Sequence, residues 1–291
     1  MNGDEKIIIF VATHVAFQPP RNPIYVPLHV GRYGKKDLGY IGDDTGNHIS
    51  DLNYLYGELT GLFWIWQNIS GLDYIGLNHY RRFFINDKHT FMDREQYLEI
   101  LQNCDAIVPK HMQCEGGLNY YEHFAQAHNR KDLDAVRRAL IRVYPEYEEC
   151  FDCAMSGDIY YWGNLMVTCA EIMKRYAEWL FTIFAEASEE IDVSKYDDYH
   201  KRVYGFLSEQ MFYVYALKNE LKLTEIPVGV SSVKAETQTI IEEIKELMKN
   251  GKLSEARETL KTQLKNRPDL LLPGSDLNSE LEEICKNLKI F

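Results

Sequence analysis

The feature that most constrains this chain is an apolar run that ends in polar and cationic residues, from Leu72 to Phe84. Residues 74–77 read Tyr-Ile-Gly-Leu, which is too short for a helix and is typical of a buried β-strand. Five residues with polar, aromatic or cationic side chains follow directly: Asn78, His79, Tyr80, Arg81 and Arg82. In an open α/β sheet ligands bind beyond the carboxyl ends of strands, so this strand end is a candidate ligand site.

Arg81 and Arg82 give this strand end a chemical preference. The planar donors of a guanidinium group can bind two oxygens of a phosphate at once. Asn78 and His79 add hydrogen-bonding groups beside them. The residues alone leave two interpretations open, a phosphate-binding site or a surface arginine pair covered by neighbouring aromatic side chains.

The net charge of −12 argues against nucleic acid as a partner, because binding to nucleic acid needs a basic surface. It also argues against simple attraction to anionic lipid. An anionic ligand would need a local positive site, which can act alone because salt screens charges beyond about 10 Å. Arg81, Arg82 and Arg202 are the candidates for such a site.

Length and composition indicate a folded chain. The 291 residues, 45% hydrophobic and 13% aromatic, suffice for one α/β domain and a small appendage. No apolar run of about 18 residues predicts a membrane span, and the acidic start does not resemble a signal peptide, so we expect a cytoplasmic location. We expect the six cysteines to be free and reduced, since no second pair completes a zinc site.

Strand and helix patterns alternate over the first 230 residues, which predicts an α/β fold with a mostly parallel sheet. Residues 6–11 form an apolar strand that ends at Thr13 and His14, candidate contacts for a nucleobase or ribose. A simple cap of the strand end is the alternative. Neither a dinucleotide-binding glycine motif nor a P-loop occurs.

Residues 39–50 are dense in Gly, Asp, Asn and Thr, which is typical of turns. The adjacent carboxylates of Asp43 and Asp44 suit a divalent cation or sugar hydroxyls, although a plain loop has the same composition. Residues 54–68 have the apolar spacing of a helix, with Asn53 as its N-cap.

Two side chains of the 54–68 helix need an explanation. Glu58 would lie near the buried side, where a carboxylate requires a partner or a function. Trp66 is either part of the core or a platform for a sugar.

Residues 199–219 are predicted to form a second informative helix. Arg202, Gly205 and Glu209 share one face of it by their spacing of three and four. The Arg and Glu are either an internal ion pair or members of a site. Residues 160–168, which include Asn164, are predicted to form a strand.

The composition changes sharply after Ser232, because Phe291 is the only later Trp, Tyr or Phe. This predicts one domain over residues 1–232, the only part that can carry an aromatic core, and a helical appendage over 233–291, with helices at 237–249, 253–266 and 276–288. Four residues have a spacing similar to part of a tetratricopeptide repeat: Gly251, Ala256, Leu260 and Pro268. The appendage either mediates self-association or contact with a protein partner, or is a plain stabilising hairpin.

Several stretches together resemble a bacterial glycosyltransferase family catalogued as domain of unknown function 4422. They occur in one order over roughly the first 230 residues: VATH, IYVPLHVG, GYIGDDTGNHIS, ELTGLFWIWQN, DYIGLNHYRRFF, YYWGNLMV and RVYGFLSEQ. Members of that family accompany capsule, exopolysaccharide and lipopolysaccharide synthesis. The resemblance implies an A-type glycosyltransferase-like nucleotide-binding domain.

The resemblance also implies a function. The protein would transfer a sugar from a nucleotide donor, most simply a uridine diphosphate (UDP) sugar, to a growing cell-surface polysaccharide or lipid-linked oligosaccharide. Such chemistry needs a base, charge compensation for the leaving diphosphate, and positioning of both substrates. Glu209 is the candidate base, followed by Asp44 and Asp43. The candidate donor-binding residues are Thr13, His14, Ser50, Asn53, Asn78, His79, Arg81 and Arg82. The candidates either for contact with the acceptor or for support of the contacting residues are Glu58, Trp66, Asn164 and Arg202.

One departure bears on metal dependence. Many A-type transferases carry Asp-x-Asp after the strand that DYIGL resembles, whereas this chain has Asn78, His79 and Tyr80 there. Either protein cations replace the metal, or Asp43, Asp44 and His79 hold Mn²⁺ or Mg²⁺.

Rival functions are a non-catalytic binding or scaffold protein of a polysaccharide-assembly complex and a nucleotide-sugar hydrolase. For an acceptor at the membrane, we expect peripheral association with its inner face.

Overall fold

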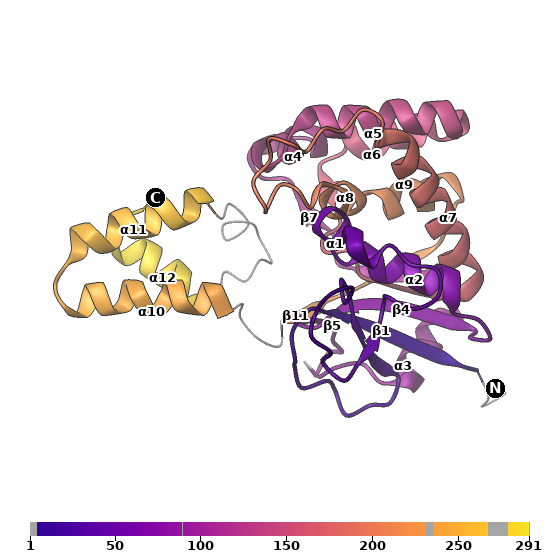
Figure 1. Cartoon of the computed structure of the whole chain (residues 1–291), viewed down its shortest axis with the longest axis horizontal. Coiled ribbons are helices and arrows are strands. Elements are labelled where there is room, and N and C mark those ends of the chain that lie inside the picture. Colours follow the sequence, from indigo (N-terminus) through magenta and orange to yellow (C-terminus); the bar gives the residue numbers. More distant parts are fainter. Residues whose placement is uncertain (1–4, 89, 231–234, 267–278, 291) are drawn as a thin grey trace. The chain divides into compact units, whose positions relative to one another are not determined.

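A computed structural model describes residues 5–88, 90–230, 235–266 and 279–290. The chain divides into two compact units, Met1–Gly229 and Val230–Phe291, which are described separately (Figure 1). The boundary expected from composition, after Ser232, falls on residues 231–234, outside the described residues.

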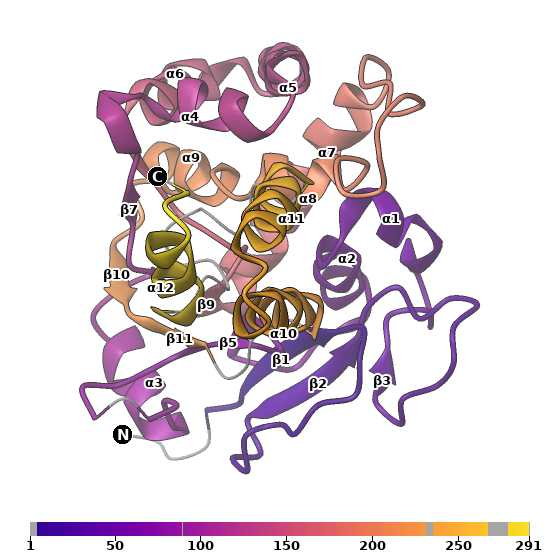
Figure 2. The same cartoon turned by 90° about the vertical axis from the view of Figure 1, so that its left-hand side faces the viewer.

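A nine-stranded sheet forms the centre of the first unit among the described residues. Its main path runs through seven strands: β10 (Leu223–Ile226), β6 (Ala106–Pro109), β9 (Met166–Cys169), β4 (Tyr74–His79), β1 (Ile7–Thr13), β2 (Tyr25–His29) and β3 (Ile41–Gly42). The pairs β1–β2, β1–β4, β2–β3 and β6–β10 are parallel, whereas β9 runs antiparallel to β4 and β6. Figure 2 shows β1, β2 and β3 side by side. The predicted α/β fold with a mostly parallel sheet is confirmed.

A short hairpin extends the central strand. β4 continues through Asn78 and His79, further than the apolar run predicted, and β5 (Arg82–Phe84) turns back along it with His79 paired to Arg82. β11 (Val228–Val230) pairs with β5. A separate two-stranded sheet joins β7 (Met112–Gln113) to β8 (Ile159–Tyr160).

Helices cover both faces of the sheet (Figure 1). One face carries α2 (Leu59–Asn68) and α7 (Ala170–Ala187), and the other carries α3 (Arg94–Leu101). Successive β1 residues alternate between the two cores, as the pleat of a strand requires, with Phe10 in the first and Ile9 in the second. The remaining helical segments of this unit are η1 (Ser50–Leu52), α1 (Asn53–Tyr56), η2 (Glu115–Gly117), α4 (Tyr120–Ala127), α5 (Arg130–Val143), η3 (Pro145–Tyr147), α6 (Glu148–Ser156), α8 (Val203–Ser208) and α9 (Met211–Lys218).

The predicted 54–68 helix is wrong in its continuity. It is broken at Gly57, whose φ of 55° lies outside the helical region, so α1 and α2 are separate. Asn53 does not cap the start of α1; instead its side-chain amide donates a 2.6 Å hydrogen bond to the carbonyl oxygen of Gly57. The break places Glu58 at the junction of two helices.

Two further elements are interrupted. The predicted 199–219 helix ends at Ser208 and begins again at Met211, so Glu209 and Gln210 lie between α8 and α9. The predicted 160–168 strand is broken by Gly163 and Asn164, whose φ values of 87° and 53° are incompatible with a strand. Both interruptions occur next to the candidate site.

The second unit contains α10 (Ala235–Lys249), α11 (Leu253–Asn266) and α12 (Ser279–Asn287). Its helices enclose an apolar core of their own: Ile240, Ile241, Ile244, Ala256, Leu260, Leu264, Leu281, Ile284, Cys285 and Leu288. Gly251, with a φ of 73°, forms the turn between α10 and α11. Pro268 and residues 276–278 lie outside the described residues, and the likeness to a tetratricopeptide repeat stays a prediction.

Within the described ranges, no helix combines the length and the apolar character needed to cross a membrane. None of the six cysteines, all of which lie within the described residues, forms a disulfide.

Candidate active site

Four predicted donor-binding residues meet at the carboxyl ends of β1 and β4. The parallel register places Val11 beside Asn78, so Thr13 and His14 lie next to His79. The His14 ring is exposed and packs edge-on against Tyr80 at 5.5 Å between centroids. This edge is where an open parallel sheet binds its ligands.

These four side chains differ in how far they are exposed to a ligand at this edge. The Thr13 hydroxyl is buried and donates a 2.6 Å hydrogen bond to the carbonyl oxygen of Val15, which is the strand-end cap considered from the sequence. The side chain of Asn78 is also buried, 2% exposed, and lies beside the hydroxyl group of Tyr97. His14 and His79 are therefore the more accessible members of the edge.

The two arginines occupy different environments. Tyr80 and Arg81 form the turn between β4 and β5, and Arg81 is only 4% exposed, with its guanidinium 4.9 Å from the Tyr80 ring. Arg82 lies across the hairpin from His79 and places its guanidinium 3.6 Å from the centroid of the Trp162 ring. A cation over an indole face is attracted by the ring quadrupole, which holds Arg82 beside the loop before β9.

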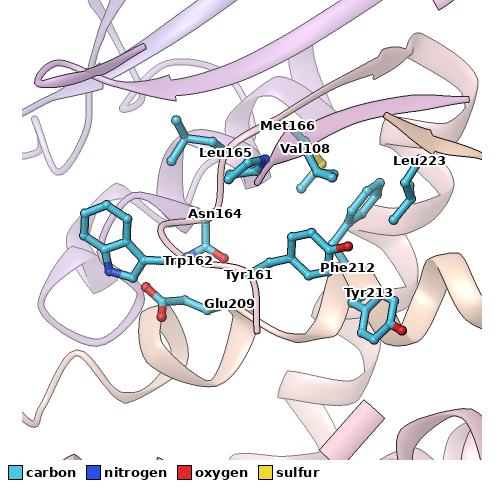
Figure 3. A pocket seen from close by; sticks show the side chains of 11 residues that line it. Val108, Tyr161, Trp162, Asn164, Leu165, Met166, Glu209, Phe212, Tyr213 and Leu223 are labelled. Atoms are coloured by element: carbon cyan, nitrogen blue, oxygen red, sulfur yellow. The ribbon is translucent and has the colours of Figure 1, made fainter. Parts of the chain in front are cut away.

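Arg82 connects the strand edge to a group of side chains that we call the Glu209 cluster, defined as Glu58, Arg82, Trp162, Asn164 and Glu209. Asn164 donates a 2.7 Å hydrogen bond from its side-chain amide to the Glu58 carboxylate. The backbone N–H of the preceding Gly163 donates to the Glu209 carboxylate at 3.3 Å. Figure 3 shows the Glu209 carboxylate pointing toward Trp162. Four elements distant in sequence thus converge here.

Glu209 has an unusual protonation equilibrium. Burial of the carboxyl group, and then the negative charge of Glu58, raise its pKa from the ordinary 4.5 to about 8. Three groups oppose that rise, the cations of Arg82 and Arg202 and the N–H of Gly163. Part of the residue reaches solvent, but the carboxyl group itself is desolvated. At neutral pH most of the Glu209 population carries a proton, and the deprotonated form is a stronger base than an ordinary carboxylate.

Two buried tyrosines, Tyr120 and Tyr160, also face Glu209. The pKa of each is raised by burial first and by Glu209 second, so neither is charged at neutral pH. The charge of Arg202 acts on Glu209 without a direct ion pair between the two side chains, and the Arg202 guanidinium packs 5.0 Å from the centroid of the Tyr199 ring. The internal ion pair considered from the sequence is therefore absent between these two described residues.

The backbone of Asn164 is held in a sparsely populated conformation. Its φ of 53° is uncommon for a residue other than glycine. Three hydrogen bonds fix the side chain, to Glu58, to the Gly205 carbonyl oxygen at 3.1 Å, and from the Ser208 hydroxyl at 2.9 Å. Such strain persists only where its surroundings determine it, and it gathers at functional sites.

Other predicted site residues lie outside the Glu209 cluster. Asp43 is fully buried and accepts hydrogen bonds from the N–H groups of Gly31 and Arg32, at 2.9 and 3.2 Å, and from the Ser50 hydroxyl. Asn53 is bonded within its own helix junction. Trp66 stacks on Phe181 between α2 and α7, with centroids 5.9 Å apart.

The residues considered for a metal do not form a metal site. The two oxygens of Asp43 are occupied by three donors, and Asp44 lies 3.6 Å from the Arg32 guanidinium. Throughout the part of the chain that the structure describes, no group of three or more His, Cys, Asp and Glu side chains could hold a metal ion.

A pocket opens beside Glu209 and was not foreseen from the sequence. Eleven residues line it: Val108, Pro109, Tyr161, Trp162, Asn164, Leu165, Met166, Glu209, Phe212, Tyr213 and Leu223 (Figure 3). The signal that could have indicated it is Gly163-Asn164, a pair typical of turns inside an apparent strand and directly after two aromatic residues.

The mostly parallel sheet with helices on both faces defines an α/β domain. A solved structure, that of the bifunctional glycosyltransferase WbbM in its apo form, superposes with a TM-score of 0.71 and 28% sequence identity. The match covers 78% of this chain but 46% of that one, so the chain spans less than half the length of WbbM. Residues 8–220 match the family described as domain of unknown function DUF4422, and the chain belongs to this family. No curated protein matches the sequence.

Proposed function

We propose that the first unit transfers a sugar from a UDP-sugar donor to a growing cell-surface polysaccharide or lipid-linked oligosaccharide. The observation that carries this proposal is the buried Glu209 carboxyl group, with a pKa of about 8, which lies with Arg82 beside the carboxyl end of β4. The likeness to WbbM over 78% of the chain supports the transferase class.

In this proposal the donor lies along the edge formed by β1 and β4. His14 and His79 contact the nucleoside, and the buried residues Thr13 and Asn78 support them. Arg82 counters the charge of the diphosphate, because charge-assisted hydrogen bonds from guanidinium to phosphate are the strongest available here. Arg81 is buried in the turn and supports the position of Arg82.

The transfer step follows from the position of Glu209. The deprotonated carboxylate removes the proton of an acceptor hydroxyl group, and the acceptor oxygen forms a bond to the anomeric carbon of the donor sugar. The bond from that carbon to the diphosphate oxygen breaks, and UDP leaves with its negative charge opposed by Arg82. Glu58, held by Asn164, keeps the pKa of Glu209 high enough for it to accept the proton.

The partners and location follow from this assignment. The acceptor would be a glycan or a lipid-linked oligosaccharide at the inner face of the cell membrane, where the protein would associate peripherally from the cytoplasm. The second unit would provide a surface for self-association or for a protein partner. The alternative is a scaffold without catalysis, in which the second unit, which has an apolar core of its own, would recruit a partner.

A thermal-shift series with nucleotides tests the donor assignment. UDP and at least one UDP-sugar should stabilise the protein, by about 2.7 kcal/mol at a hundredfold excess over Kd. We expect the same stabilisation with Mn²⁺ and with EDTA, since Arg82 rather than a metal would face the diphosphate. Adenosine and guanosine diphosphates serve as controls for general phosphate binding. A protein that no nucleotide stabilises would contradict the proposal.

A further inference from the structure

Helix α8 leaves one narrow face outside the core, and that face ends at Glu209. All residues of the helix except Phe206 are buried. Arg202, which precedes the helix, is exposed, and Glu209, which follows it, is half-buried. The backbone N–H of Phe206 donates to the carbonyl oxygen of Arg202 at 3.4 Å, and the N–H of Glu209 donates to that of Phe206 at 3.3 Å. This spacing of four and three residues places a cation, an aromatic ring and an acid in one row.

Arg202 differs from the neighbouring cation in what it contacts. The Lys201 ammonium lies 2.8 Å from the Asp198 carboxylate, so its charge is already matched. The Arg202 guanidinium packs instead on the rings of Tyr199 and Phe206, 5.0 and 5.5 Å from their centroids, and no carboxylate among the described residues forms an ion pair with it. The N–H donors at the edge of this exposed guanidinium can therefore bind an external anion.

The aromatic rings under Arg202 hold one another in place. Tyr199 and Phe206 lie 5.0 Å apart, and His128, at the end of α4, stacks on Phe206 with centroids 4.2 Å apart. A guanidinium attracted to these rings loses less freedom on binding than one extended into water. Its planar fork matches two oxygens of a carboxylate or a phosphate.

The position of Arg202 relative to Glu209 indicates which substrate it would meet. At the helical rise of 1.5 Å per residue, the Cα atoms of these two residues lie about 10 Å apart. An acceptor glycan that places a hydroxyl group at Glu209 can span this distance and place an oxyanion at Arg202. The diphosphate of the donor would be opposed by Arg82, which is held on Trp162.

We propose that Arg202 binds a carboxylate or phosphate group carried by the acceptor, so that the preferred acceptor is an acidic glycan. The inference rests on the proposed transferase function and adds to it the charge class of the acceptor. Tyr199, Phe206 and His128 are positioning residues that act through Arg202. A neutral glycan would still reach Glu209, but it would bind more weakly because it lacks the ion pair.

Saturation-transfer NMR titrations of the full chain, saturated with UDP, test the assignment. The probes are methyl β-D-glucopyranosiduronate, α-D-glucose 1-phosphate and the neutral methyl β-D-glucopyranoside. UDP fills the donor site, so the phosphate probe reports on the acceptor side. At least one anionic probe should bind at least about fivefold more tightly than the neutral one, and the tighter of the two distinguishes a carboxylate from a phosphate.

Variants at two adjacent positions make the test specific. Arg202→Gln should remove the preference for the anionic probe, whereas Arg202→Lys, which keeps the charge but not the planar fork, should retain part of it. Lys201→Gln is the matched control and should keep the whole preference, because it removes a neighbouring cation already paired with Asp198.

Three results would overturn the assignment. The first is a UDP-bound protein that binds the neutral probe as tightly as both anionic ones. The second is Arg202→Gln with an undiminished preference. The third is Arg202→Gln that loses affinity for UDP itself, which would place Arg202 in the donor site. An anionic preference that depends on Arg202 in a protein that does not bind UDP would instead reject the proposed transferase function and leave the anion site standing.

Discussion

Glu209 couples the proposed chemistry to the stability of the first unit. A carboxyl group whose pKa rises from 4.5 to about 8 on folding holds a proton that the unfolded chain releases. The groups that face it are Glu58, Arg82, Arg202 and the two uncharged tyrosines Tyr120 and Tyr160. Glu58 and burial favour the proton, and the two arginines oppose it.

This linkage predicts how the free energy of unfolding depends on pH. Because the folded state binds the extra proton, the contribution of Glu209 is complete below about pH 4.5 and declines as the pH rises to about 8. Glu209→Gln mimics the protonated acid and should lack this decline, so the variant should gain stability relative to wild type over that range. Urea unfolding at several pH values measures the difference. A constant difference across the range would show that the pKa of Glu209 is not raised.

Arg82→Ala should weaken the binding of UDP. Loss of a charge-assisted hydrogen bond worth roughly 1.5–3 kcal/mol corresponds to about a ten- to hundredfold rise in Kd. Isothermal titration calorimetry measures that constant, with Arg138→Ala as a control, since Arg138 is an exposed arginine paired with Glu190 on the helical layer. Equal affinity of Arg82→Ala and wild type would remove Arg82 from the donor site. Arg81→Ala is less informative, because the side chain is buried and its loss would also destabilise the turn.

At the residue scale, the sequence distinguishes candidate site residues more clearly among charged side chains in apolar surroundings than among polar side chains in loops. Glu58 and Glu209 stood out because an apolar helix face does not tolerate a carboxylate without a reason. Asp43 and Ser50 were less distinguishable, since turn composition is the same whether a carboxylate binds a ligand or the backbone. The backbone donors of Gly31 and Arg32 that occupy Asp43 become visible only in the folded loop.

The loop of residues 161–165 is the element that organises the site. It supplies the Trp162 ring for Arg82, the Gly163 N–H for Glu209 and the Asn164 amide for Glu58. The loop also carries Tyr161 and Leu165 into the pocket wall. Its conformation therefore determines both the position of Arg82 at the edge of the sheet and the wall of the pocket.

Substitutions at Asn164 should separate the strain of this loop from its hydrogen bonds. Asn164→Ala places an alanine at a φ of 53° and leaves the Glu58 carboxylate without its donor, so it should cost about 2–4 kcal/mol of unfolding free energy. Asn164→Gly removes the strain but not the loss of hydrogen bonds, and should cost less.

Glu220→Gly provides the reference for these measurements in urea unfolding. Glu220 is exposed and has a φ of 52°, so the change relieves the backbone alone and should stabilise slightly. If Asn164→Ala were as stable as wild type, the loop would not be held by the contacts described here.

Apolar runs predicted the strands at residues 6–11 and 74–77, which are β1 and β4. Apolar spacing also located the 54–68 and 199–219 segments, but not the interruptions within them. The breaks at Gly57, at Glu209-Gln210 and at Gly163-Asn164 depend on contacts between distant segments, such as the bond between Asn164 and Glu58. A pattern read along one stretch of chain does not contain those contacts.

On the scale of the whole molecule, two separate apolar cores predict two independently folding units. The aromatic core of the first unit lies entirely before residue 230, and the second unit encloses its own aliphatic core. A chain ending at residue 230 should therefore unfold cooperatively and bind UDP with the Kd of the full chain. Thermal unfolding with and without UDP tests this. A broad, non-cooperative transition would show that the second unit completes the fold of the first.

The central claim is that Glu209 is the base for sugar transfer from a UDP donor. The most direct test is the rate of UDP release from UDP-sugars over pH 6 to 9, with methyl β-D-glucopyranoside, methyl β-D-galactopyranoside and methyl α-D-mannopyranoside as acceptors. Wild type should show a kcat/KM that rises with pH and levels off above about 8, as the pKa of Glu209 requires. Glu209→Gln should bind UDP normally and release it about 10²–10⁴-fold more slowly. A folded Glu209→Gln variant with undiminished turnover would contradict the account and return the search for the base to Asp44 and Asp43.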